Sequence, residues 1–184
     1  MEQPKQGAPR EDARGPRSAV RGRANGRGGR PGGRGRAPRE RGEFDQVTIA
    51  ARRVARVMAG GRRFNFSIAV VIGDRKGRVG VGLGKGADTA LAIEKATRDA
   101  KKHLITVART KTNSIPHTVS AKYASSVVEV RPSPGRGVVA GSAMRTVLEL
   151  AGVSDVVTKI LSRSKDKLTI ARATVAALEQ LRSR

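Results

Sequence analysis

The stretch GGRRFNFSIAVVIGDRKGRVGVGLGKG, residues 60–86, decides the fold of the central part of the chain. Every second residue from Phe64 to Ile72 is apolar, which is typical of a strand with one buried face. A second alternating run follows the turn sequence Asp74–Gly77 and ends in glycines around Lys85. Two alternating runs joined by a short turn predict an antiparallel β-hairpin.

The apolar spacing changes after Asp88 and predicts a helix, for which Asp88 or Thr89 is a suitable N-cap. The apolar face of this helix is expected to contain Ile93, Ala96, Ala100, Leu104 and Val107. Upstream, residues 44–59 alternate loosely and predict another strand, with a helix as the alternative, and Gly60–Gly61 forms the turn that follows. The first unit is therefore expected to be a three-stranded antiparallel sheet with one helix packed on it.

The second half of the chain predicts another unit of mixed structure. Two strand-like runs at 118–132 precede a helix at 142–151, which a glycine stops. One more strand follows, and Asp166 is a suitable N-cap for a last helix. The fold class is therefore α+β, with two small domains at 44–110 and 111–184.

The N-terminal segment, residues 1–43, has a different composition. It contains 11 Arg, 10 Gly and 5 Pro, and its 12 basic and 5 acidic residues give a net charge of +7. Such a segment has too little apolar surface to offset the entropy lost on ordering, so we expect a disordered Arg/Gly-rich tail. It is either a solubilising tail or an arginine arm that binds RNA phosphates, and the phosphate-matching shape of arginine favours the arm.

The composition of the whole chain points to an anionic partner. Its 184 residues carry a net charge of +23, a property that reports on partners rather than on fold. No apolar run is long enough to span a bilayer and no signal peptide is visible, so nucleic acid is expected rather than a membrane. The absence of cysteine excludes disulfides and thiolate chemistry, and 2% aromatic residues exclude base stacking as the main binding mode.

The glycines around Lys85 resemble a phosphate-binding loop, and two nucleotide motifs can be tested against them. A P-loop would need glycine at Val79 and a hydroxyl residue at Gly86, so that motif fails. The dinucleotide fingerprint needs a parallel βαβ unit, whereas the expected hairpin is antiparallel. A nucleotide pocket remains an alternative, but the favoured interpretation is that Gly82, Gly84 and Lys85 contact the phosphates of a nucleic acid.

Basic residues gather in further clusters with few balancing acids. One surrounds the Gly60–Gly61 turn and comprises Arg52, Arg53, Arg56, Arg62 and Arg63; a second, on one face of the expected helix, comprises Lys95, Arg98 and Lys102. Each alone is compatible with a solvated surface, but together they predict a nucleic-acid face, with His117 as a further RNA contact in the linker. No catalytic constellation or metal-ligand pattern is visible, so we expect neither an enzyme nor a cofactor. Glycines let a nucleic acid approach the protein backbone closely, and backbone contacts read shape rather than base sequence. This favours structured RNA over sequence-specific recognition of DNA.

The hairpin sequence followed by AIEKATRDAKK resembles the bacterial small-subunit ribosomal protein five family. The segments IPH, GVVAGSAMRTVLELAGVSDVVTKILSRS and RATVAALEQL agree with it in order, so the resemblance covers about residues 44–182. It implies an N-terminal domain like a double-stranded-RNA-binding domain without its first helix, and a C-terminal domain with a βαβ crossover. Ala59, Arg136 and Ser142 differ from the residues usual in the family.

The resemblance also implies a function. It implies a cytoplasmic, non-enzymatic component of the small ribosomal subunit that binds ribosomal RNA, supports assembly and affects translational accuracy where the messenger RNA enters. The expected protein partners are small-subunit proteins four and eight, contacted through Gly135, Arg136, Gly137 and Arg145. A free RNA chaperone and a nucleotide enzyme are the alternatives; sedimentation with the small subunit distinguishes the first, and saturable nucleotide binding the second.

Overall fold

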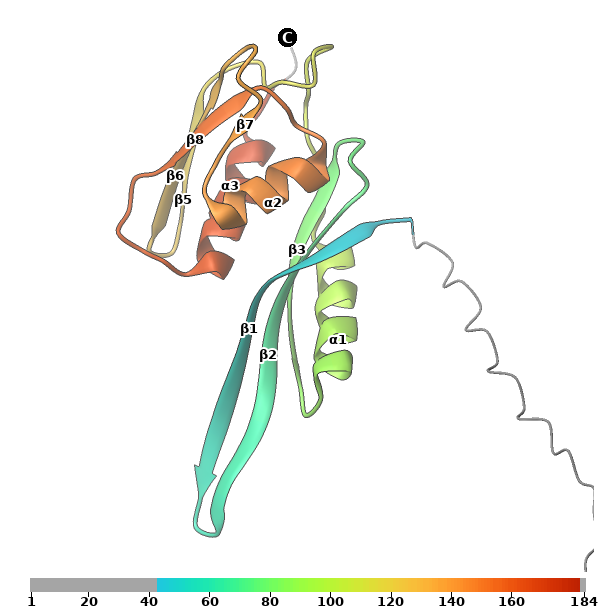
Figure 1. Cartoon of the computed structure of the whole chain (residues 1–184), viewed down its shortest axis with the longest axis vertical. Helices are drawn as coiled ribbons and strands as arrows, with labels where there is room; N and C mark the ends of the chain where they lie inside the picture. Colours follow the sequence, from blue (N-terminus) through green and yellow to red (C-terminus); the bar gives the residue numbers. More distant parts are fainter. Residues whose placement is uncertain (1–42, 183–184) are drawn as a thin grey trace, which may run out of the picture. The chain divides into compact units, whose positions relative to one another are not determined.

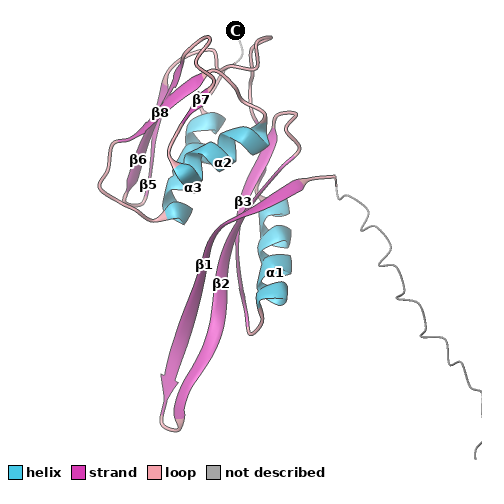
Figure 2. Ribbon diagram, viewed as in Figure 1, coloured by secondary structure: helices cyan, strands magenta, loops and turns pink. Residues whose placement is uncertain are grey.

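The structure is a computed structural model that describes residues 43–182. The N-terminal tail expected at residues 1–43 lies, apart from Glu43, outside the described residues. Figures 1 and 2 show two sheets, with helices packed on them. Within this part of the chain, no helix is long and apolar enough to cross a membrane.

The first sheet is antiparallel and has the strand order β1-β2-β3-β4. Its elements are β1 (Asp45–Met58), β2 (Gly61–Gly73), β3 (Arg78–Gly86), α1 (Thr89–Lys102) and β4 (Leu104–Thr106). The expected hairpin is confirmed, and residues 45–58 form a strand rather than a helix. The expectation of three strands was wrong, because the chain after α1 returns to the free edge of β3.

The end of α1 differs from the prediction for the same reason. The helix stops at Lys102 with His103 as its C-cap, although the apolar spacing continued to Val107. Leu104 instead pairs with Gly80 across β3 and β4. Val107, which lies just beyond β4, is buried and donates its N–H to the carbonyl of Gly77 at 2.8 Å. A helical period and a short buried strand place apolar residues at similar positions, so spacing alone could not separate them.

The second sheet has the strand order β5-β6-β8-β7. Its elements are β5 (Val119–Tyr123), β6 (Ser126–Pro132), β7 (Val138–Val139), α2 (Ser142–Ala151), β8 (Val156–Ile160) and α3 (Lys167–Glu179). Strands β7 and β8 are parallel and α2 connects them, so the implied βαβ crossover is present. The residue pattern alone did not predict β7.

Both predicted helix limits in this domain are confirmed. Gly152 ends α2 in the left-handed conformation, with φ of 69°, which glycine adopts without steric cost. The carboxylate of Asp166 accepts a hydrogen bond from the N–H of Thr169 and caps α3. The second domain therefore follows its local sequence signals closely.

A continuous apolar core joins the two sheets. It contains Val71 and Val81 from the first sheet, Met144 and Leu148 from α2, and Val128 from the second sheet. A smaller cluster lies on the opposite face of the first sheet, where α1 packs. Domains this small bury little surface alone, so the shared core adds apolar burial to both.

Candidate nucleic-acid interface

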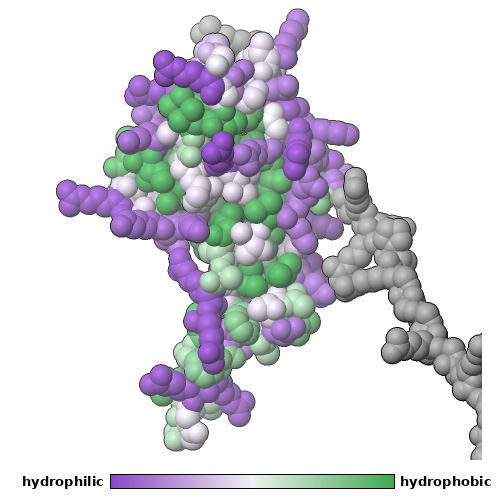
Figure 3. All heavy atoms as spheres, viewed as in Figure 1, coloured by the Kyte–Doolittle hydropathy of each residue, from purple (hydrophilic) through white to green (hydrophobic). Residues whose placement is uncertain are grey.

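The distal part of the β1–β2 hairpin is a two-stranded finger, which we define as residues 51–65 and which is exposed throughout. Figure 1 shows it extending beyond α1, and Figure 3 shows hydrophilic side chains along it. Cross-strand partners share a face, and Arg56 lies opposite Arg63 while Val57 lies opposite Arg62. Because side chains alternate along a strand, both faces of the finger are cationic.

The two faces carry different arginines. Arg52, Arg56 and Arg63 lie on one face, and Arg53 and Arg62 lie on the face on which α1 packs further along the sheet. A cation on each side of a narrow ribbon allows the finger to contact phosphates on both sides, as in a nucleic-acid groove. Among residues 43–182, Arg52 alone of these five has an ion-pair partner.

Arg53 is held in place by an aromatic ring. Its guanidinium carbon lies 3.6 Å from the centroid of the Phe64 ring, which is a cation–π contact. The stacking uses the face of the guanidinium and leaves its N–H donors at the edge available for phosphate oxygens. Phe64 is 44% exposed, so the aromatic residue supports the arginine without belonging to the core. The sequence analysis did not identify this role.

Arg52 contacts the second domain. It donates a hydrogen bond to Asp166 at the start of α3, so this arginine is matched by a carboxylate. Burial of Asp166 would raise the pKa of its carboxyl, but hydrogen bonds from Arg52 and from the N–H of Thr169 lower that pKa below its usual value. The structure therefore gives Arg52 an interdomain contact that the sequence analysis did not foresee.

The glycines of β3 have a packing role that the sequence analysis did not identify. Gly82 and Gly84 are buried against α1, and a Cβ at Gly84 would lie 2.1 Å from the carbonyl oxygen of Ala92. A Cβ at Gly82 would similarly lie 2.2 Å from the carbonyl oxygen of Ala96. These missing side chains make room for the helix, so α1 fills that space, and a phosphate contact of Gly82 and Gly84 stays a prediction. The backbone N–H of Thr89, at the start of α1, is also unavailable to a phosphate, because it donates a hydrogen bond to the carboxylate of Asp88 at 2.7 Å.

Lys85 is exposed and belongs with the arginine finger rather than with a glycine clamp. It lies opposite Ser67 on the same sheet face as Arg52. Together with Leu168 these three residues line a hollow of about 190 Å³. The predicted cation is therefore present at the base of the finger.

The remaining predicted residues are placed as follows. Lys95, Arg98 and Lys102 are exposed on α1, and Arg98 lies 4.0 Å from Glu94. His117 is exposed in the segment between β4 and β5. The structure does not bring His117 into the arginine finger, and its RNA contact stays a prediction.

The loop from Ser133 to Gly137 carries the residues expected to contact proteins. Gly135 and Gly137 have φ of 77° and 66°, and Arg136 between them is exposed. The N–H of Gly137 donates to the carboxylate of Asp155 at 3.0 Å, which holds the end of the loop. Arg145 on α2 is also exposed and pairs with Glu149 at 3.0 Å.

Arg109 is an interdomain residue that the sequence analysis missed. Its guanidinium donates to the carbonyl of Lys76 at 2.6 Å and to that of Gly152 at 3.0 Å. Beside it, the N–H of Arg75 donates to the carbonyl of Leu150 at 2.9 Å. No sequence signal could have found Arg109, because its acceptors are backbone atoms of two distant turns.

Asp74 stabilises the β2–β3 turn. Its side chain is 6% exposed and accepts hydrogen bonds from the backbone N–H groups of Lys76 and Arg78. Burial alone would raise the pKa of this carboxyl, but the hydrogen bonds from the Arg78 side chain and the two backbone groups lower it to about 2. In the described part of the chain, no group of three or more His, Cys, Asp or Glu residues could hold a metal ion.

Comparison with known protein families agrees with this architecture. The model of the ribosomal protein S5 N-terminal domain matches residues 44–108, and that of the ribosomal protein S5 C-terminal domain matches residues 121–184. The two matches correspond to the two sheets and their helices.

Individual relatives show the same similarity. The small ribosomal subunit protein uS5 of Thermus thermophilus is 44% identical over 143 residues, which are 77% of this chain and 87% of that protein. The uS5c protein of Emiliania huxleyi is 43% identical over 142 residues, or 77% of this chain and 89% of that protein. The uS5 protein of Mycoplasmopsis agalactiae is 46% identical over 142 residues, but the match spans 77% of this chain and only 61% of that protein. With two family models matched in order, the chain belongs to the ribosomal protein S5 family and is a structural, non-enzymatic component of the small ribosomal subunit.

Proposed function

We propose that the chain binds small-subunit ribosomal RNA chiefly through the arginine finger. The observation that carries this proposal is the arrangement of Arg53, Arg56, Arg62 and Arg63 on both faces of an exposed two-stranded ribbon, without an acidic partner among residues 43–182. Such a ribbon neutralises phosphates on two sides at once. Because phosphates carry no base information, the finger recognises RNA shape rather than sequence.

The salt dependence of RNA binding tests this role directly. Replacing Arg53, Arg56 and Arg62 together by alanine should weaken binding to a structured small-subunit ribosomal RNA fragment. If each side chain loses one phosphate contact, the slope of log affinity against log salt should become shallower by roughly 0.7–0.9 per contact.

A matched control comes from the second domain. Lys159, Arg163 and Lys165 are also exposed and, within residues 43–182, have no ion-pair partner, so their replacement removes the same formal charge elsewhere on the protein. The control variant should keep the wild-type slope more closely than the finger variant. Equal loss from both variants would show that net charge, and not the finger, drives binding.

We also propose that the loop carrying Arg136, together with Arg145, contacts neighbouring ribosomal proteins. The support is the exposure of both arginines and the anchoring of the loop by Asp155. The expected partners are small-subunit proteins four and eight, and through them the chain would support assembly and translational accuracy near where messenger RNA enters. Calorimetric titration with each purified protein tests this: Arg145→Ala should weaken at least one complex, and unchanged titrations with both would contradict the assignment.

The proposed cellular role is that of a cytoplasmic ribosomal component rather than a free RNA chaperone. A tagged chain should sediment with small subunits at high magnesium concentration. A chaperone would instead remain at the top of the gradient. The Arg/Gly-rich segment 1–43 is proposed to add sequence-independent RNA affinity, so its removal should lower affinity and make the salt slope shallower while leaving sedimentation with the subunit in place.

A further inference from the structure

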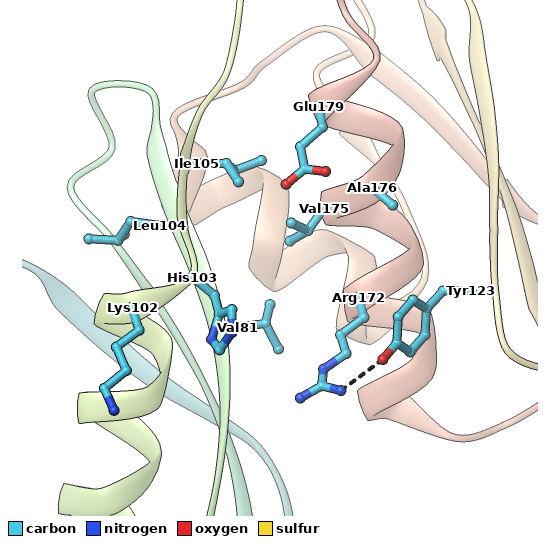
Figure 4. Close-up of a pocket in the computed structure, with 10 residues that line it drawn as sticks. All are labelled: Val81, Lys102, His103, Leu104, Ile105, Tyr123, Arg172, Val175, Ala176 and Glu179. Carbon is cyan, nitrogen blue, oxygen red and sulfur yellow. Dashed lines mark hydrogen bonds between the residues drawn. The ribbon is translucent and has the colours of Figure 1, made fainter.

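A cleft of about 490 Å³ lies where the end of α1 and β4 approach α3 and the end of β5. Figure 4 shows His103 on one side and Arg172 on the other, with Val81 between them. The volume falls in the range of small-ligand sites, which is about 300–1,000 Å³. Apart from Lys102, which belongs to the predicted nucleic-acid face, no residue that lines this cleft has been given a function above.

The floor of the cleft is apolar and one wall is aromatic. Val81, Ile105 and Val175 line it, and Val81 is 4% exposed. Tyr123 stands beside them with 38% of its surface exposed and is the single tyrosine of the sequence. An exposed ring next to an apolar floor offers a flat planar group both contact surface and a stacking partner.

The rim of the cleft is mainly cationic. Arg172 donates to the hydroxyl oxygen of Tyr123 at 2.8 Å, and its guanidinium carbon lies 5.6 Å from the ring centroid. Within residues 43–182, neither Arg172 nor Lys102 has an ion-pair partner. Both cations are therefore free to bind an anion at the rim.

One carboxylate, that of Glu179, also lines the cleft. In the described part of the chain it makes no hydrogen bond or ion pair, and Figure 4 shows it projecting toward Ile105. A carboxylate above an apolar floor accepts hydrogen bonds from N–H groups and repels carbonyl oxygens. An occupant of this cleft must therefore combine an anionic group, a flat apolar body and an N–H edge.

We propose that the cleft binds one unpaired nucleotide of ribosomal RNA, an inference that rests on the RNA-binding function proposed above. The base lies on the apolar floor beside Tyr123, and its phosphate is held by Arg172, while Lys102 adds positive charge on the opposite side of the cleft. Glu179 accepts a hydrogen bond from the amino group of the base, which favours cytosine over uracil because uracil presents a carbonyl oxygen at that position. An acidic peptide would pair with the two cations but would leave the apolar floor beside Tyr123 uncovered.

The single tyrosine makes the cleft directly observable. Full-length protein labelled with 3-fluorotyrosine has one fluorine site, at Tyr123, so its ¹⁹F NMR resonance reports on this cleft alone. Hexacytidylate should shift the resonance saturably and at lower concentration than hexauridylate. Hexaglutamate, which matches the anionic charge without a base, should leave it unshifted; an equal shift by hexaglutamate would overturn the proposal in favour of a general anion site.

Three variants separate the parts of the site. Arg172→Met should weaken hexacytidylate binding about tenfold, the loss expected of one charge-assisted contact, whereas Arg163→Met, at an exposed arginine outside the cleft lining, should not. Ala176 also lines the cleft, so Ala176→Leu fills part of it without changing its charge and should weaken binding as well. Glu179→Gln should abolish the preference for hexacytidylate over hexauridylate.

The same sample separates failure of this inference from failure of the proposed function. If a structured ribosomal RNA fragment binds but neither the fragment nor the oligonucleotides shift the resonance of Tyr123, the cleft takes no nucleotide, while the role of the arginine finger stands. If the fragment does not bind at all, the proposed function itself is wrong. Oligonucleotide binding that is unaffected by both Arg172→Met and Ala176→Leu would also overturn the proposal.

Discussion

The packing of β3 against α1 gives the sharpest prediction, at Gly84. A Cβ added there would lie 2.1 Å from the carbonyl oxygen of Ala92 and 2.4 Å from the nitrogen of Ala96. Both atoms are helix backbone, so no rotamer change can relieve the overlap. Gly84 is also paired with Ile68 of β2, which holds the strand from the other side. The substitution Gly84→Ala therefore requires the contact with Ala92 to lengthen by about 1.3 Å, because ordinary contacts begin near 3.4 Å.

The expected loss of stability follows from this displacement. Overpacking a well-packed core costs about 1–3 kcal/mol. A gap of about 1 Å also forfeits a quarter to a half of the dispersion energy of the neighbouring contacts. Since Ala92, Ala96 and Ala100 are fully buried on the face of α1 that packs on the sheet, we expect the destabilisation by Gly84→Ala to lie near the upper end of this range, at about 3 kcal/mol. That is a large part of the roughly 5–15 kcal/mol that stabilises a typical domain.

Urea unfolding of the full chain measures this effect. Gly60→Ala is the matched control, because no atom lies within 4 Å of a Cβ at Gly60; its free energy of unfolding should stay within about 0.5 kcal/mol of wild type. Under conditions where Gly84→Ala remains folded, its RNA-binding salt slope should be unchanged, because no cation is lost. A stability within about 0.5 kcal/mol of wild type would refute the packing argument. Unchanged stability with weakened RNA binding would restore the phosphate-contact interpretation of this glycine.

Three further predictions concern other sites. The pKa of Asp74 is about 2 in the folded protein, below its ordinary value of 3.8, so the stability that this carboxylate contributes is present above about pH 4 and is lost as the pH falls toward 2. The excess stability of wild type over Asp74→Asn should therefore shrink over that interval in acid-unfolding curves. Gly152→Ala places a Cβ 2.0 Å from the carbonyl oxygen of Arg75, at a backbone φ of 69°. Gly137 has a similar φ of 66° but open space around it, so Gly152→Ala should lower the free energy of unfolding in urea by more than Gly137→Ala does. Asp166→Ala removes the N-cap of α3 and should cost about 1 kcal/mol of stability. It also releases Arg52, which should steepen the salt dependence of RNA binding. Loss of stability without a change in slope would mean that Arg52 does not face RNA.

The sequence alone determined the elements whose signals are local. Alternation over residues 64–72 and the Asp74–Gly77 turn predicted the central hairpin, which the register of β2 and β3 confirms. Asp166 marked the start of α3 and Gly152 the end of α2, because capping depends on the dihedral angles and donors of neighbouring residues. The arginines of the finger could be named for the same reason: once the turn at Gly60–Gly61 was recognised, their place on a ribbon followed.

The tertiary structure alone decided the features that depend on distant partners. Strand β4 has three residues and β7 has two, too few for a periodic signal, and each exists because a neighbouring strand offers a free edge. Arg52 pairs with Asp166, which lies 114 positions further along the sequence. Local sequence patterns could therefore not show that this arginine has a carboxylate partner and is less available to a phosphate. The glycines of β3 suggested a phosphate site from local density, but their role depends on how closely α1 approaches. That distance depends on long-range packing between the helix and the sheet, which local sequence patterns do not encode.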